Sequence, residues 1–113
     1  MELTINEKDY KFIFGYGFLK EINKQNRVNA QGITINAGIE AVATNLASGD
    51  IETLISTLRT ANATETPRVS EKALAGYVEE NGADELFDEV FEELKKSAFT
   101  SKKVTKILEQ MEA

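Results

Sequence analysis

The sequence lacks two residue types on which much enzyme chemistry depends: it has no cysteine and no histidine. Without cysteine there are no disulfides, thiolate metal sites or thiol nucleophiles. Without histidine the commonest general base and neutral metal ligand are missing. Tryptophan is also absent, and proline occurs once. We therefore expect a protein that acts by binding, with no catalytic residue, no cofactor and no metal site.

Long apolar runs are missing as well. No segment approaches the roughly 20 apolar residues that a membrane-spanning helix needs. The first residues, Met1 to Thr4, have neither the basic nor the apolar region of a signal peptide. We therefore expect a cytoplasmic protein that does not contact membranes. Its net charge is −6, from 13 basic and 19 acidic residues, so we expect no nucleic-acid partner, because phosphate binding needs cationic side chains.

What the chain does contain is typical of a folded domain. Hydrophobic residues make up 42% and charged residues 28%, a balance that indicates a globular and not a disordered chain. A length of 113 residues fits one domain over residues 1–113. Such a chain buries roughly two-thirds of the surface that its unfolded form exposes, so it can fold without covalent cross-links.

Apolar residues alternate with polar ones on both sides of a short polar break near the N-terminus: Leu3, Ile5, Tyr10, Phe12 and Phe14. This period of two predicts a β-hairpin over residues 2–14 with one buried face. The break contains no Asn-Gly pair, so we expect a turn of three or four residues. A two-stranded sheet leaves backbone groups unpaired on both outer edges, where a strand of a partner or a second copy can add.

The remaining chain shows mainly helical spacing of apolar residues. The predicted helices span residues 16–26, 35–48, 50–61, 70–81, 84–98 and 101–112. Residues 27–32 show no clear period, and we interpret them as a loop. The expected fold class is α+β, mostly α, with an N-terminal two-stranded β-hairpin packed on about five to six helices. The aromatic face of the hairpin must pack on those helices, because a lone hairpin is marginal in water.

Two features are candidates for partner binding. One is the edge of the hairpin. The other is the apolar stripe of the last helix, which either closes the core or docks on a partner as a helix in a groove. The candidate partner-binding residues are Leu3, Ile5, Ile107, Leu108 and Met111.

Acidic residues gather in the second half of the chain. Residues 1–60 carry 6 basic and 7 acidic residues, and residues 61–113 carry 7 and 12, so the two halves have charges of −1 and −5. The acidic residues of 84–93 precede Lys95 and Lys96, the order that a helix dipole favours, and we interpret them as a solvated helix face. The alternative is an acidic DNA mimic or a regulatory protein-binding module that uses this face.

Several short segments, in order along nearly the whole chain, share one resemblance. They span residues 3–6, 10–12, 14–24, 49–54, 61–69, 86–90 and 93–97. The second and third read Tyr-Lys-Phe and Phe-Gly-Tyr-Gly-Phe-Leu-Lys-Glu-Ile-Asn-Lys. These segments resemble the tail assembly chaperones of long-tailed phages and prophages of Gram-positive bacteria.

The resemblance implies a protein that is not an enzyme. It would bind the phage tape-measure protein in the cytoplasm of the bacterial host, keep it soluble and help the tail tube assemble around it. It would leave before the virion is complete. In many such phages a ribosomal frameshift makes a longer form that also contacts tail tube subunits. Many copies along one elongated client would favour self-association, with the hairpin edges as one route.

Overall fold

The computed structural model describes residues 1–112. It confirms the predicted mostly α-helical α+β class, with an N-terminal hairpin and six helices in that range. The elements are β1 (Glu2–Ile5), β2 (Lys8–Lys11), α1 (Tyr16–Gln25), β3 (Arg27–Ala30), β4 (Ile33–Asn36), α2 (Gly38–Ala47), α3 (Ile51–Asn62), α4 (Glu71–Asn81), α5 (Asp84–Lys96) and α6 (Ser101–Glu112).

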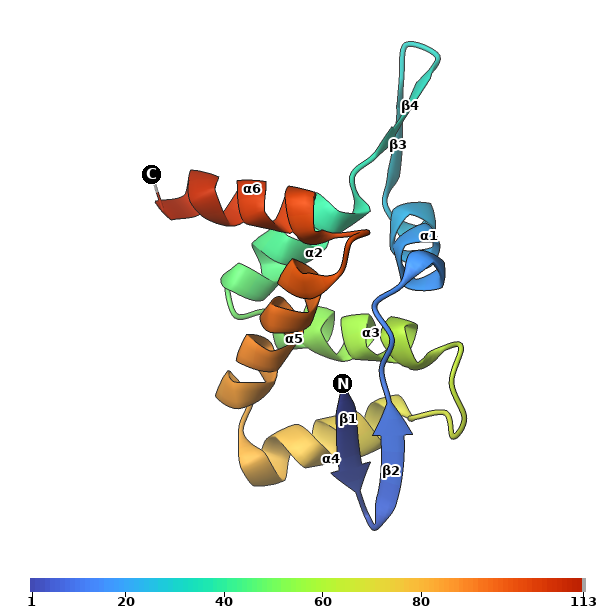
Figure 1. Ribbon diagram of the computed structural model, residues 1–113, viewed down its shortest axis with the longest axis vertical. Helices are drawn as coiled ribbons and strands as arrows, with labels where there is room; N and C mark the ends of the chain where they lie inside the picture. The colour runs from blue at the N-terminus through green and yellow to red at the C-terminus, as the bar shows by residue number, and fades with distance from the viewer. Residues whose placement is uncertain (113) are drawn as a thin grey trace.

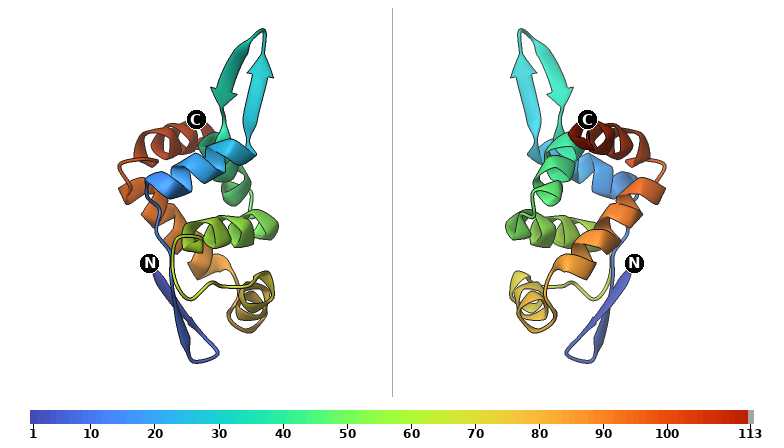
Figure 2. Two further views of the ribbon diagram at one scale, coloured as in Figure 1. Left: turned by 90° about the vertical axis from the view of Figure 1, so that its right-hand side faces the viewer. Right: turned by 90° about the vertical axis from the view of Figure 1, so that its left-hand side faces the viewer.

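The six helices form the body of the molecule, and two hairpins lie at opposite ends of its long axis (Figure 1). The β1–β2 hairpin lies beside α4, whereas the β3–β4 hairpin projects away from the helices in every view (Figures 1 and 2). The molecule measures 49 × 31 × 22 Å. Its radius of gyration of 14.3 Å exceeds the ~13 Å typical of about 100 residues, as expected for a body with a projection.

The N-terminal hairpin pairs β1 and β2 with Ile5 opposite Lys8, so its loop has two residues. The prediction of a three- or four-residue turn was therefore wrong. Asn6 and Glu7 both adopt positive φ, 51° and 67°, which is the backbone of a type I′ turn. The right-handed twist of the strands favours this turn strongly enough that Glu7, an unusual residue for it, is accommodated. Leu3, Ile5 and Tyr10 pack into the core.

The two outer edges of this hairpin differ. The Asn62 Nδ2 atom donates to the carbonyl of Lys11, and the N–H of Ile13 donates to the carbonyl of Ala61, so the end of α3 occupies the β2 side. The expectation of two open edges was therefore wrong for the end of the β2 edge that lies next to α3. On the β1 side, Glu2 and Thr4 are the non-hydrogen-bonded positions of the ladder, so their backbone groups face outward. No hydrogen bond among the described residues engages that edge.

Residues 27–36 form a second hairpin where the sequence predicted a loop over 27–32 and the start of a helix at 35. Its two-residue turn consists of Gln31 and Gly32, which both have positive φ. The following helix begins at Gly38 instead. An added Cβ at Gly38 would lie 2.5 Å from the backbone oxygen of Ile22, so a glycine is needed where α2 begins against α1. This close approach fixes the two helices that flank the second hairpin.

The core runs through all six helices and the first hairpin, and its fully buried members include Phe12, Ile22, Leu54, Leu74 and Val104. Two helices begin at residues whose side chains cap the first turn. The Asp50 carboxylate accepts from the N–H of Thr53, and the Ser70 hydroxyl accepts from the N–H of Ala73.

Candidate interaction surfaces

Two of the predicted partner-binding residues belong to the core. Leu3 is 5% exposed and Ile5 is 7% exposed, so their side chains pack inside the molecule. They lie on β1, the strand whose outer edge is open. In this fold β1 therefore offers a partner its outward main-chain groups, and not these two side chains.

The other three predicted residues lie together on α6, which packs on α2 and α5. Val104 is fully buried, Ile107 and Leu108 are half-buried, and Met111 is 50% exposed. Near the start of α6, the Lys103 Nζ atom lies 3.2 Å from Glu40 Oε1 and donates to the Asn36 carbonyl at the base of the second hairpin. The apolar stripe thus closes the core at its beginning and reaches solvent at its end.

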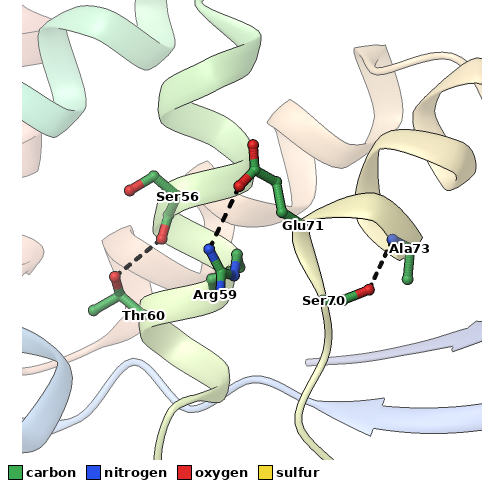
Figure 3. A network of polar contacts seen from close by, with 6 residues as sticks. All are labelled: Ser56, Arg59, Thr60, Ser70, Glu71 and Ala73. Atoms are coloured by element: carbon green, nitrogen blue, oxygen red, sulfur yellow. Dashed lines mark hydrogen bonds and ion pairs between the residues drawn. The ribbon is translucent and has the colours of Figure 1, made fainter.

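A large hollow lies between α1, α3 and the start of α4. It encloses about 1010 Å³ and is lined by Gly17, Glu21, Glu52, Ile55, Arg59, Thr64, Arg68 and Glu71 among others. Figure 3 shows its polar wall, where Arg59 and Glu71 approach to 3.7 Å and the Thr60 hydroxyl donates to the Ser56 carbonyl. Side chains of both signs line an open groove, which suits a peptide segment better than a reaction that needs enclosure.

A second surface is an apolar patch made of Ile13, Tyr16 and Phe99, which we call the aromatic patch. Their exposed fractions are 48%, 58% and 50%. The rings of Tyr16 and Phe99 lie 5.7 Å apart, and Lys20 Nζ lies 5.5 Å from the Tyr16 ring. The patch joins the segment before α1 to the turn between α5 and α6. A hydrogen bond of 2.6 Å from the Ser97 hydroxyl to a carbonyl of that segment holds the two together.

The acidic side chains of α5 lie on its exposed side, and Leu86, Val90 and Leu94 are buried on the other. This is the solvated helix face that the sequence predicted. Across residues 1–112, no three or more acidic side chains are placed to hold a metal ion. Nor does any helix in the described part of the chain have the length and apolar character needed to cross a membrane.

Sequence reasoning missed the aromatic patch and the second hairpin. Ile13 stands in the alternating run but on the opposite face from Phe12 and Phe14, which was the available signal that it points outward. Phe99 stands in a short break between helices, where periodicity carries no information. Its partnership with Tyr16, 83 residues earlier in the chain, depends on tertiary structure.

Comparison with curated proteins gave no match, and comparison with solved structures gave none either. One family model, described as "Phage tail assembly chaperone protein, TAC", matches residues 2–109. The match includes both hairpins and all but the end of α6. On this evidence the chain belongs to the phage tail assembly chaperone family.

Proposed function

We propose that this chaperone binds the phage tape-measure protein, keeps it soluble in the cytoplasm of the bacterial host and helps the tail tube assemble around it. The observation that carries the proposal is the family match over residues 2–109. A chaperone is not an enzyme class, and the described surfaces suit binding. We further propose that a longer, frameshifted form contacts the tail tube protein, and that the chaperone is absent from the mature virion.

The physical demands on such a protein support the proposal. A chaperone for a long helical client needs exposed apolar area for contact and charge for solubility, and its binding must be reversible. The exposed acidic face of α5 provides charge. The end of α6 provides apolar area, because Ile107 and Leu108 are half-buried and Met111 is half-exposed. We propose these three residues as side-chain contacts for the client.

The role proposed for Leu3 and Ile5 is different, because their side chains are buried. They hold β1 against the core and thereby present the outward backbone groups of Glu2 and Thr4. An extended client segment could add to this edge as a further strand.

The test is binding of the purified tape-measure protein to wild-type chaperone and to Met111→Ser. Burial of a half-exposed Met side chain is worth about 1 kcal/mol, so Met111→Ser should weaken binding roughly three- to tenfold. Gln110→Ser, an exposed polar neighbour on the same helix, should leave binding unchanged. If the wild type binds and Met111→Ser binds equally well, the contact is misplaced. If the wild type does not bind, the proposed function is wrong.

A charge-reversed variant separates this function from the acidic-mimic alternative. Replacement of Glu85, Glu89 and Glu92 by Lys should leave client binding largely intact, because these side chains lie on the solvated face of α5. Loss of all activity in this variant, with client binding never detected for the wild type, would favour the mimic instead.

A further inference from the structure

The charges of α6 are arranged against the dipole of the helix itself. Lys102 and Lys103 lie in its first turn, which has no acidic residue. Glu109 and Glu112 lie in its last turn, which has no basic residue. A helix dipole is positive at its N-terminal end and negative at its C-terminal end, so these four side chains weaken α6. In α5 the order is the favourable one, with acidic residues first and lysines last. The stability of α6 therefore depends more on its packing.

The packing that holds α6 in place is slight. Val104 is its one fully buried residue, whereas α3, which also has 12 residues, buries five. Lys103 joins the start of α6 to Glu40 and to the Asn36 carbonyl. From residue 105 to residue 112, no hydrogen bond or ion pair among the described residues connects α6 with another element. The second half of the helix is therefore held by its half-buried apolar stripe alone.

The surface beneath α6 belongs to two helices with buried apolar faces. α6 packs on both α2 and α5. α2 buries five of its ten residues, and α5 buries Val90 and Leu94 among others. We call the part of α2 and α5 that α6 covers the α6-binding surface. One charged group marks it, because the Oε1 atom of Glu40 on α2 is enclosed by the protein and lies 3.2 Å from Lys103 Nζ.

The sequence of α6 indicates which helix this surface binds. Val104, Ile107 and Leu108 recur at helical spacing on one face, and the lysine before them pairs with Glu40. A helix with the same apolar spacing and a basic residue at its start therefore fits the same surface. A helix without that cation would leave the enclosed carboxylate oxygen of Glu40 with no charged partner, so charge selects a basic helix.

The client contacts proposed above require α6 to move. Ile107 and Leu108 are half-buried and packed against the core, so a client reaches these side chains fully only when α6 lifts off. The same movement uncovers the α6-binding surface. One movement thus provides two apolar faces, between which a helix of the client can lie.

We propose that α6 leaves α2 and α5 as a unit and that a basic amphipathic helix of the client takes its place. This proposal rests on the proposed function, because the client is the occupant. Docked α6 competes with the client, so the apparent affinity for the client is the intrinsic affinity multiplied by the fraction of molecules in which α6 is open. The return of α6 favours release of the client, which supplies the reversible binding that a chaperone needs.

Amide hydrogen exchange of the full chain, without client, measures the opening of α6. Protection in α6 should be at least about 100-fold lower than in α3, because a helix that detaches opens without global unfolding. The dipole variant, Lys102→Glu/Glu112→Lys, keeps the net charge and places both charges favourably. It should slow exchange in α6 about five- to tenfold. Val104→Ala shortens the fully buried side chain of α6 and should speed exchange there at least about tenfold.

The matched control exchanges two charges in the same sense on another helix. Lys72→Glu/Glu79→Lys changes exposed residues in the first and last turns of α4 and should leave exchange in α6 unchanged. Circular dichroism checks that each variant is folded.

A labelled peptide of residues 101–112, added to the full chain, measures whether the α6-binding surface is vacated. Its binding, followed by fluorescence anisotropy, should be tightest to Val104→Ala, weaker to the wild type and weakest to the dipole variant. The tape-measure protein should displace the peptide, and its own affinity for the three chains should follow the same order. A role of α6 as a contact surface alone would not tighten client binding in Val104→Ala.

The outcomes separate this proposal from the proposed function. If α6 exchanges as slowly as α3, or if the peptide binds none of the three chains at its highest soluble concentration, the proposal is wrong. If the client binds but does not displace the peptide, it uses another surface, so the proposal is wrong while the proposed function stands. If the client binds neither the wild type nor Val104→Ala, the proposed function is wrong, and the client as occupant with it.

Discussion

The side chain of Asn62 joins three segments of the fold, and its replacement by Ala is expected to be strongly destabilising. Asn62 is the last residue of α3 and is 1% exposed. Its Nδ2 atom donates to the carbonyls of Lys11 at 2.9 Å and Pro67 at 3.1 Å. Its Oδ1 atom accepts from the N–H of Val69 at 2.7 Å. The residue therefore connects β2, α3 and the segment that leads into α4.

The loss of stability can be worked out from whether each hydrogen-bond partner of Asn62 can bond to water after the substitution. The N–H of Val69 is buried and would lose its acceptor, which costs about 1–3 kcal/mol. The carbonyls of Lys11 and Pro67 belong to exposed residues, so water can replace the amide at a net cost of about 1 kcal/mol each. The sum is about 3–5 kcal/mol of a total stability of roughly 5–15 kcal/mol. At about 4 °C per kcal/mol, Tm should fall by about 12–20 °C.

Thermal and urea unfolding followed by circular dichroism measure this effect. Asn81→Ala is the matched control, because Asn81 also ends a helix but is exposed and makes one hydrogen bond, to the Tyr77 carbonyl. Asn81→Ala should cost less than about 1 kcal/mol. Equal losses of stability for the two variants would refute the reasoning that burial of three bonds makes Asn62 special.

Three further changes test other parts of the fold by the same unfolding measurements. Gly38→Ala should destabilise by more than about 2 kcal/mol, because the new Cβ meets backbone atoms of Ile22 that cannot move aside; an unchanged Tm would contradict this. Asp50→Ala should cost about 1 kcal/mol through loss of the N-cap bond to Thr53, and Asp50→Asn should restore most of it. Val104→Ala should lower the free energy of urea unfolding by about 2 kcal/mol, because the substitution removes buried methyl groups. A loss of less than about 0.5 kcal/mol would show that α6 is not part of the core.

Much of the fold was predictable because most elements follow a period set by burial. Leu54 and Leu58 of α3, for example, repeat at helical spacing, and both side chains are fully buried in the core. Asp50 and Ser70 are residue types that favour the N-cap position, because their side-chain oxygens satisfy backbone donors that no helix can satisfy internally. In the first hairpin, Leu3 and Tyr10 occupy the one buried face that alternation predicts.

The second hairpin was not predictable by the same argument, because its apolar face is not buried in this chain. Ile35 stands four residues before Ile39, a spacing that also fits a helix, and this led to the wrong helix start. Gln31 and Gly32 are a less distinctive turn pair than Asn-Gly, so the turn gave no clear signal. Periodicity predicts an element well where one of its faces is buried in the core, and it is weakest where an apolar face stays exposed, as in this hairpin.

Among the predicted binding residues, too, the sequence did not distinguish buried from exposed side chains. Leu3 and Ile5 alternate with polar residues because their side chains are buried in the core. On the outer edge of β1, only backbone groups are open to a partner. On α6, the periodicity that suggested Ile107, Leu108 and Met111 could not distinguish the part that closes the core from the part that remains exposed. That distinction depends on where α2 and α5 cease to cover α6, which only the three-dimensional arrangement determines.

The central claim is that this chain keeps the tape-measure protein soluble by binding it. The most direct test is co-expression of the two proteins, followed by size exclusion with light scattering. We predict a soluble complex that holds several chaperone copies per client, under conditions where the client alone precipitates. A client that stays insoluble while the chaperone elutes by itself would contradict the account.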